Sequence, residues 1–271
     1  MTPFHRLLPK TKAWTPPELT LHAGWASFVG NRQKNEDVAL CLSEPRVFAV
    51  ADGMGGHAHG EFAAKTTVEH FAKWMLHAHA RNWSWPREWG QRPNTGNEPL
   101  MRCILARALA QANEEVLRHI ECNVAYAGMG STFSGGVFYR HAFHWIHVGD
   151  TRIYRLRGGQ ITLLTRDQNY RELIRASGHP DSRDQLAQFG HRLTQHVGMD
   201  GLLPEQGCEP CAPGDTFLIC SDGLYETLGP IQVCAILADA TRMPERQAEQ
   251  FMMKAKDAKA SDNATAVVIQ L

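Results

Sequence analysis

Three β-prone runs follow one another closely between residues 131 and 157, and they constrain the fold more than any other part of the chain. The runs are STFSGGVFY, AFHWIHV and RIYRLR, and only short connections separate them. A parallel pair of strands needs a crossover of a dozen or more residues, so this stretch predicts antiparallel hairpins. Other short β-prone runs are bounded by Gly, Asp, Asn or Pro, as strands usually are. They lie at 22–29, 46–51, 216–220 and 264–270.

Two longer segments, 61–79 and 100–122, have the residue spacing of amphipathic helices. In both, apolar residues recur every three or four positions and form one stripe. A third helix is predicted over 244–258, where a proline stands at the start. Antiparallel strands combined with amphipathic helices predict an α+β fold in which the helices are layered outside the sheet.

The composition indicates a globular protein with a sizeable core. Of the 271 residues, 43% are hydrophobic, which is too many for a disordered or fibrous chain. Lys and Arg total 28, as do Asp and Glu, so binding to nucleic acid through bulk positive charge is not expected. No run approaches the ~20 apolar residues of a membrane helix, and the first residues do not resemble a signal peptide. Together with an odd number of cysteines, seven, these features predict a cytoplasmic protein with reduced thiols.

Acidic residues recur where the β-prone runs end or begin. The pattern is VADG after one run, HVGD after another, ICSDG after a third and SDN directly before the last. Asp and Glu are poor strand residues and cost several kcal/mol when buried unpaired. One acid at such a place is as commonly a turn residue or a helix cap, but repetition at five sites indicates a shared role. The residues are Asp52, Asp150, Asp222, Asp262 and the pair Glu36 and Asp37.

If the strands share one sheet system, these carboxylates converge at one edge of it. Like charges placed so close either take up protons or recruit a cation. Ligands that are all oxygen select hard divalent ions, Mn²⁺ or Mg²⁺. Two such ions ~3.5–4 Å apart can hold a bridging water and aim it for in-line attack. Gly53, directly after Asp52, allows the backbone to approach a ligand closely, so its carbonyl is a further candidate ligand.

One arginine, Arg32, stands four residues before Glu36. Its planar fork suits two phosphoryl oxygens at once, and it stays charged at any working pH. An arginine near acids is usually a surface ion pair. Beside a convergent cluster of carboxylates, however, it indicates an anionic substrate, and phosphate is the first candidate.

At these residues the chain resembles the metal-dependent protein phosphatases of the PP2C (PPM) family. The matching segments follow the family's order from about residue 21 to residue 271, and the wording DGMGGH is similar to the stand-alone bacterial branch. The segments read GNRQKNED, VADGMGGHAHGE, GMGSTF, HVGDTRIYRLR, LTRDQN, RLTQHVG, ICSDGLYETL and SDNATAVVI.

The resemblance implies a central sandwich of two antiparallel β-sheets flanked by pairs of α-helices. It also implies hydrolysis of phosphoserine and phosphothreonine in proteins with Mn²⁺ or Mg²⁺. Bacterial relatives typically reverse the action of a Ser/Thr kinase encoded nearby, and some control type VI secretion. A cognate kinase and its substrates are therefore the expected partners in signalling.

The resemblance also assigns roles to individual residues. It implies that Asp52 bridges two metals, that Arg32 takes the phosphoryl group, and that Asp150 matches the ligand of a third, weaker metal. The remaining expected metal-site residues are Glu36, Asp37, the Gly53 carbonyl, Asp222 and Asp262, with Asn263 just behind them.

The resemblance covers most of the chain and predicts its layout. Residues 1–20 are a Pro-rich extension, and 21–271 form the phosphatase-like domain. Within that domain, 83–99 are a loop insertion that contains three tryptophans, which we expect at the edge of the core. Residues 170–192 are the expected flap, mobile and rich in charge.

The sequence departs from the family at the proton donor. Eukaryotic members have a histidine two positions after the bridging aspartate, and here that position is Met54. Proton donation to the leaving oxygen is left open between His57 and a metal-bound water. Gly190 and His191 also replace the Arg-Asn pair that usually ends the flap.

Two other functions compete with catalysis. A pseudophosphatase would keep the fold and bind a phosphorylated partner without turnover, but the presence of every core acid and of Arg32 argues against it. A structural Ca²⁺-binding domain would use the same acids and would have no need for Arg32.

Overall fold

The computed structural model describes residues 20–55, 59–92, 99–177 and 189–271. Most of the predicted N-terminal extension, the candidate proton donor His57 and the centre of the predicted flap lie outside these ranges. The described chain forms two β-sheets, and every neighbouring pair of strands within them is antiparallel.

The first sheet has five strands in the order β1-β11-β10-β7-β8. Its strands are β1 (His22–Phe28), β11 (Ala264–Gln270), β10 (Thr216–Cys220), β7 (Arg152–Arg157) and β8 (Gln160–Leu163). The second sheet has six strands in the order β2-β3-β5-β6-β9, with β4 paired to β3. Its strands are β2 (Asp37–Leu42), β3 (Val47–Met54), β4 (Gly130–Ser131), β5 (Phe133–Tyr139), β6 (Ala142–Val148) and β9 (Glu205–Pro210).

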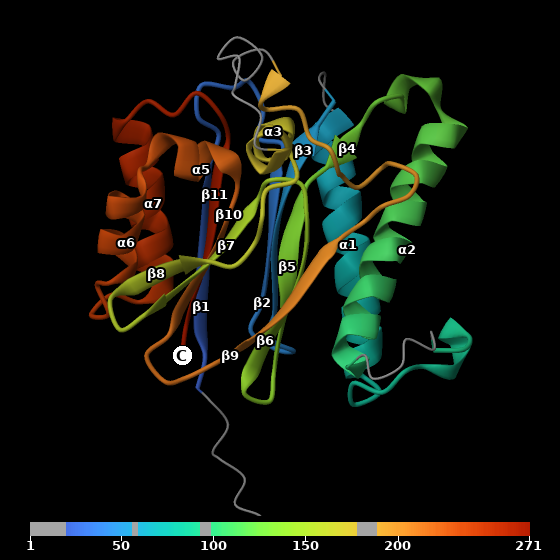
Figure 1. The fold of residues 1–271 in the computed structure, drawn as a ribbon, viewed down its shortest axis with the longest axis horizontal. Coiled ribbons are helices and arrows are strands. Elements are labelled where there is room, and N and C mark those ends of the chain that lie inside the picture. The colour runs from blue at the N-terminus through green and yellow to red at the C-terminus, as the bar shows by residue number, and fades with distance from the viewer. Residues whose placement is uncertain (1–19, 56–58, 93–98, 178–188) are drawn as a thin grey trace, which may run out of the picture.

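Helices cover the outer face of each sheet (Figure 1). Helices α1 (His59–His79) and α2 (Leu100–Cys122) lie against the second sheet, and α6 (Pro230–Leu237) and α7 (Pro244–Asp257) lie against the first. Two shorter helices, α3 (Tyr170–Ser177) and α5 (Asp222–Thr227), stand at one end of the sandwich. Single 3₁₀ turns are formed by Arg87–Trp89 and Val124–Tyr126.

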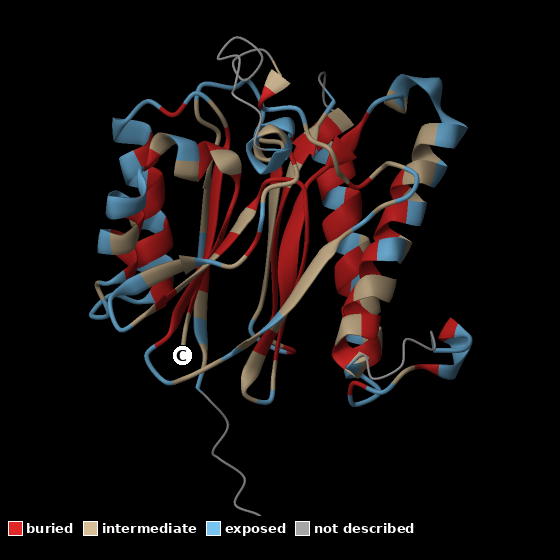
Figure 2. Ribbon diagram, viewed as in Figure 1, coloured by how far each residue is buried: buried red, intermediate tan, exposed pale blue. Residues whose placement is uncertain are grey.

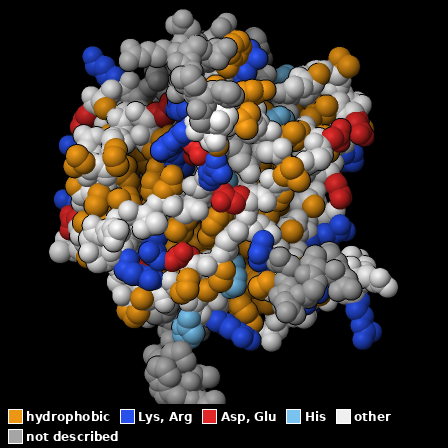
Figure 3. Space-filling model, viewed as in Figure 1, with side chains coloured by type: hydrophobic (Ala, Val, Ile, Leu, Met, Phe, Trp, Pro, Cys, Tyr) orange, Lys and Arg blue, Asp and Glu red, His pale blue; other side chains and the backbone are white. Residues whose placement is uncertain are grey.

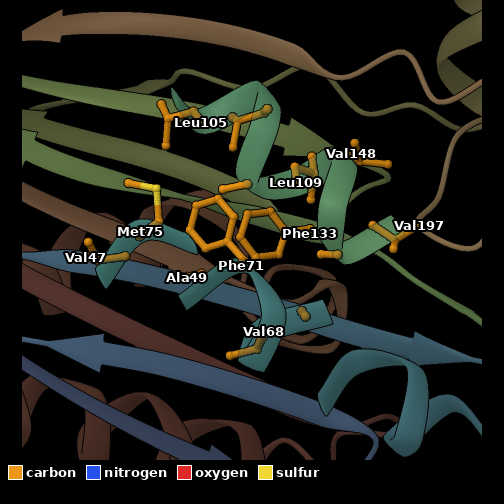
Figure 4. Packing of buried hydrophobic residues seen from close by; sticks show 14 of the residues in the cluster. Val47, Ala49, Val68, Phe71, Met75, Leu105, Leu109, Phe133, Val148 and Val197 are labelled. Carbon is orange, nitrogen blue, oxygen red and sulfur yellow. The ribbon is translucent and has the colours of Figure 1, made fainter. Parts of the chain in front are cut away.

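Three hydrophobic clusters fill the three interfaces between these four layers. The cluster between α1, α2 and the second sheet includes Phe71 and Phe133, whose ring centroids are 4.5 Å apart (Figure 4). A second cluster, around Phe251, joins α6 and α7 to the first sheet. The third joins the two sheets through Phe48 and Phe217. Buried residues therefore face inward on all four layers (Figure 2), which gives each helix stripe and each strand face a packing partner.

The predicted fold class, a sandwich of antiparallel sheets between helix pairs, is confirmed. The predicted strands and the three predicted helices agree with the structure to within three residues at every end. The short strands β8 and β9 and the helices α3, α5 and α6 carry no clear periodic signal and were not predicted. For example, β9 reads EQGCEP, which contains residues that are poor in strands.

One connection differs from the prediction. Strands β5 and β6 form the expected hairpin, but β7 leaves their sheet and pairs with β10 and β8 in the other one. The chain changes sheet at Gly149, whose φ of 97° is open to glycine at no steric cost. A short connection between strands can therefore lead from one sheet to the other instead of forming a hairpin. Asp150 lies in this connection, which we call the corner.

The tryptophans of 83–99 lie at the edge of the helix-side cluster. Trp83 and Trp89 are buried, and Trp85 packs beside them. The segment was expected to be a loop without regular structure, but its described part includes the 3₁₀ turn Arg87–Trp89.

Candidate active site

A cleft of about 540 Å³ opens at the end of the sandwich where α3, α5 and β4 lie in Figure 1. Eight of the nine residues predicted for the site line it. They are Arg32, Glu36, Asp52, Gly53, Asp150, Asp222, Asp262 and Asn263. The elements that supply them are strand ends and the loops beside them, so antiparallel pairing has brought acids from distant parts of the chain together.

The ninth predicted residue, Asp37, does not line the cleft. It is buried, and it faces Asp52 directly across the pairing of β2 and β3. The Ser221 hydroxyl donates a hydrogen bond of 2.7 Å to its Oδ2. Asp37 therefore lies behind the wall of the cleft.

The end of β3 is fixed by strand β4 and the residue after it. The Asp52 amide donates to Thr132 Oγ1 at 3.0 Å, and the Asp52 carbonyl accepts from the Thr132 amide at 2.8 Å. At the next position only glycine fits, because a Cβ on Gly53 would stand 2.1 Å from the Gly60 carbonyl oxygen. The first turn of α1 is thus packed directly against the backbone of Asp52 and Gly53.

Asn263 holds the loop that carries Arg32 and Glu36. Its Nδ2 donates to the carbonyls of Val29 and Lys34 at 2.8 and 2.9 Å, and its Oδ1 accepts from the Glu36 amide at 2.8 Å. All of these bonds go to backbone groups. Asn263 therefore positions the loop relative to Asp262 and β11.

Asp150 stands at the corner between the two sheets. The Tyr225 hydroxyl of α5 donates to its carbonyl at 3.0 Å. The buried Asn169 amide lies 3.4 Å from its Oδ2. Both contacts come from outside the second sheet, so the position of Asp150 depends on the packing of α3 and α5.

The carboxyl groups of the cleft are held in an environment that opposes their ionisation. Burial, reinforced by neighbouring acids, raises the pKa of Asp37 and of Asp150 to about 7 and that of Asp222 to about 6. The pKa of Asp52 is raised well above its usual range by burial and then by Asp37 and Asp222. A cation placed among these groups would reverse the effect.

Two carboxylate oxygens of the cluster have no hydrogen-bond partner within the described residues although they are buried. They are Asp37 Oδ1 and Asp222 Oδ1. Buried polar atoms are nearly always paired in native proteins. The cation nearest to the cluster is Arg32, whose Nη2 donates to Asp262 Oδ2 at 2.6 Å. Orphaned oxygens in a group of like charges indicate a place for a cation that the described residues do not supply.

The chemistry of the donors fits a hard divalent ion that keeps part of its water shell. In the described part of the chain, no three acidic, histidine or cysteine side chains stand close enough to hold one ion by themselves. Any ion here would therefore also use carbonyl and water oxygens. Such mixed oxygen coordination is usual for Mg²⁺ and Mn²⁺, and Mg²⁺ in particular gives up its water reluctantly.

The sequence matches the family described as "Protein phosphatase 2C" over residues 30–256. The chain belongs to the protein phosphatase 2C family. Membership confirms the resemblance found in the sequence motifs, and the phosphatase 2C fold explains why the two sheets and two helix pairs recur in relatives of low identity.

Three relatives show the extent of the likeness. The "Serine/threonine protein phosphatase PstP" of Mycobacterium tuberculosis is 29% identical over 244 residues, which is 88% of this chain and 42% of that protein. The chain thus spans about two-fifths of the length of this curated relative. The solved structure of "PppA, a key regulatory component of T6SS in Pseudomonas aeruginosa" is 28% identical with a TM-score of 0.75, covering 93% of this chain and 98% of that one.

A third relative is the PstP catalytic domain solved "in complex with 2 Manganese ions". It is 24% identical with a TM-score of 0.73, and the likeness covers 93% of this chain and 99% of that one. At this identity the likeness concerns the fold of the two proteins.

Several residues that were not predicted as site residues also line the cleft of this phosphatase 2C domain. Thr132 follows β4, and a group from the C-terminal side of the predicted flap closes one wall. That group is His191, Arg192, Leu193 and His196. Thr132 and His196 lie inside the motifs GMGSTF and RLTQHVG, so motif membership was the available signal, but neither residue stands at a strand end beside an acid.

Proposed function

We propose that this chain is a metal-dependent protein serine/threonine phosphatase. The observation that carries the proposal is the convergence of Asp52, Asp150, Asp222 and Asp262 on one cleft beside an arginine. Buried carboxylate oxygens without partners support a site for cations, and the arginine supports an anionic substrate. The name of the relative PstP, a serine/threonine protein phosphatase, agrees with this reaction class.

The residues divide between cation binding and substrate binding. Glu36, Asp52, the Gly53 carbonyl, Asp222 and Asp262 would hold two Mn²⁺ or Mg²⁺ ions, and Asp37 would support them from behind the wall. Asp150 would bind a third, weaker ion. When bound, such ions supply Lewis-acid stabilisation and lower the pKa of an attacking water.

Arg32 would bind the phosphoryl group. Its side chain is 55% exposed, and within the described residues its guanidinium forms an ion pair with Asp262 alone. An exposed pair of this kind contributes little to stability. Arg32 can therefore turn toward a phosphate and bind two of its oxygens in a fork.

The substrates would be phosphorylated proteins, and the expected partner is a cognate Ser/Thr kinase whose action this phosphatase reverses in signalling. The likeness to PppA, described as a regulatory component of T6SS, supports type VI secretion as the first pathway to test. Among the described residues, no helix is long and apolar enough to cross a membrane. We place the reaction in the cytoplasm, where kinase substrates are found.

The rival function is phosphoprotein binding without turnover. It would require the loss of at least one group that chemistry needs, yet Arg32 and all the predicted acids are present, and all but Asp37 line the cleft. The arrangement therefore favours catalysis.

The full chain should release phosphate from phosphothreonine and phosphoserine peptides when Mn²⁺ is added, and EDTA should abolish the release. A phosphotyrosine peptide is the matched control. Tight phosphopeptide binding without release would support the pseudophosphatase. Thermal stabilisation by Ca²⁺ with no Mn²⁺-dependent hydrolysis would instead support a structural calcium domain.

A further inference from the structure

Hydrolysis of a phosphoserine or phosphothreonine ends with a proton on the hydroxyl oxygen of the protein substrate. A serine or threonine alkoxide is a strong base, so its departure is slow unless an acid protonates it as the bond breaks. Met54 lines the cleft two residues after Asp52, and a thioether cannot supply a proton. A proton donor other than Met54 is therefore needed, and this question rests on the proposed function.

The His196 side chain lies beside Met54. A Cβ built on Gly130 would stand 2.6 Å from His196 Nδ1 and 2.8 Å from the Met54 methyl carbon. Both side chains therefore use the space that a glycine leaves at the start of β4. His196 itself lines the cleft together with Asp52 and Asp222.

One nitrogen of the His196 ring is fixed by the backbone. Nδ1 donates to the Val197 carbonyl at 3.0 Å, because a carbonyl oxygen can only accept. The same carbonyl accepts from the Ser131 amide at 3.1 Å. Ser131 in turn donates from its hydroxyl to the Asp52 carbonyl at 3.1 Å. The His196 ring is thus connected to the backbone of Asp52, at the end of β3, through the Val197 carbonyl and Ser131.

Within the described residues the His196 ring is hydrogen-bonded through Nδ1, and its other nitrogen, Nε2, makes no hydrogen bond there. In a neutral imidazole whose Nδ1 carries the hydrogen, Nε2 is the atom that gains and releases a proton. It is therefore the atom of His196 available to a substrate in the cleft.

The other described histidine that lines the cleft, His191, is engaged elsewhere. The Arg171 guanidinium lies 3.3 Å from both of its ring nitrogens, and Glu226 lies 3.8 Å away. These contacts join α3 to α5. His191 is accordingly a link between two elements, whereas His196 has one nitrogen held and one unengaged.

We propose that His196 is the general acid of this phosphatase. As water oxygen bonds to phosphorus and the P–O bond to the substrate breaks, the electron pair of that bond goes to the serine or threonine oxygen. The proton on Nε2 of the imidazolium moves to that oxygen, which leaves neutral imidazole. The proton lost by the attacking water passes to solvent, and solvent reprotonates Nε2, so atoms and charge balance.

The test compares two leaving groups. On a phosphothreonine peptide, His196→Gln should lower kcat by at least ~10²-fold, the usual contribution of general acid catalysis. On p-nitrophenyl phosphate, whose phenolate leaves without protonation, kcat should change by less than about 3-fold. His191→Gln is the matched control, and it should leave the ratio of the two rates at the wild-type value.

The thermal shift that Mn²⁺ produces should be the same in His196→Gln and wild type, which shows that fold and cation binding are intact. Equal losses on both substrates, or none on the peptide, would overturn the assignment. If the glutamine variant does not fold, His196→Ala with added imidazole replaces it, and partial rescue on the peptide alone is the expected result. Absence of turnover by the wild type would overturn the proposed function itself and is distinguishable from either outcome.

Discussion

The acids of the cleft differ from two other acids, Asp167 in the loop after β8 and Asp215 directly before β10. Asp215 is 1% exposed and receives two hydrogen bonds of 2.6 Å from Arg157. Asp167 is held in the same two-bond manner by Arg152, at 2.9 and 2.7 Å. Each of these acids thus has a guanidinium of its own.

The cleft acids have no such arrangement. Asp52, Asp150 and Asp222 form no ion pair within the described residues, and their pKa values are raised by burial and by neighbouring acids. The charge of a buried acid that has an arginine is compensated, whereas a buried acid without one weakens the fold unless a cation arrives. Over the face shown in Figure 3, charges of both signs are mixed.

The largest expected effect comes from removing a cleft acid. Asp52→Asn should lower turnover at least ~10³-fold, because a Lewis-acid site supplies several kcal/mol of transition-state stabilisation. Phosphate release from a phosphothreonine peptide in Mn²⁺ measures it. In EDTA the variant should melt no lower than the wild type, since it loses one of several repelling carboxyls. Near-wild-type turnover would end the assignment of cations to this cleft.

The next largest effect is expected from replacing Arg32, the arginine proposed to bind the phosphoryl group. Arg32→Ala should raise KM for a phosphopeptide about 10-fold and change kcat much less, because phosphate is bound in both the ground and transition states. Arg32→Lys, which keeps the charge but loses the fork, is the control and should lie between the two. A large loss of kcat with an unchanged KM would mean that Arg32 acts only in the transition state.

Removing a paired acid should affect stability and leave catalysis intact. Asp215→Asn leaves Arg157 without its carboxylate, and we expect a loss of about 2 kcal/mol in the free energy of unfolding, below the value for a fully buried pair because Arg157 is 40% exposed. Urea unfolding gives the free energy, and kcat measured on the folded fraction should not change. A fall in kcat equal to that of Asp52→Asn would remove the distinction between the two groups of acids.

The smallest expected effect is a pH dependence of the thermal stabilisation that Mn²⁺ provides. The folded-state pKa values of about 7 for Asp37 and Asp150 lie above the ordinary value of 3.8, so between about pH 4 and 7 the folded metal-free protein binds more protons than the unfolded chain. Its stability therefore falls as pH rises through this window. Because Mn²⁺ needs ionised carboxylates, the increase in Tm that it gives should grow by a few degrees from about pH 5.5 to 7.5.

This difference between melting curves with Mn²⁺ and with EDTA cancels the contribution of groups away from the cleft. One such group is buried His147, whose pKa burial lowers to about 4. An Mn²⁺ shift that stays constant over the range would show that the cleft acids are already ionised without metal.

Most of the strand-end acids could be predicted because two simple rules act at the same residues. Strand periodicity locates the end of each run. An acid at that place stands out because a carboxylate is costly to bury without a partner. Antiparallel pairing then brings Asp52 and Asp222 to one edge even though they belong to different sheets. Motif resemblance added the roles, which spacing alone could not give.

Residues held by tertiary contacts were beyond prediction. His196 follows no strand and has no acid beside it, and its relation to Met54 depends on the missing side chain at Gly130. Asp37 was correctly placed near Asp52, but its position behind the wall is set by Ser221, which is 184 residues away. The corner at Gly149 looked like a hairpin because sequence spacing does not show which sheet the next strand joins.

The contact between Arg32 and Asp262 joins positions separated by 230 residues, and β1 pairs along its whole length with β11. Arg32, the proposed phosphate ligand, and Asp262 thus come from opposite ends of the described domain. During synthesis, the pocket stays incomplete until the final strand has left the ribosome. A protease cut that released β11 would remove the strand that joins β1 to β10, and would therefore disrupt the first sheet together with the pocket.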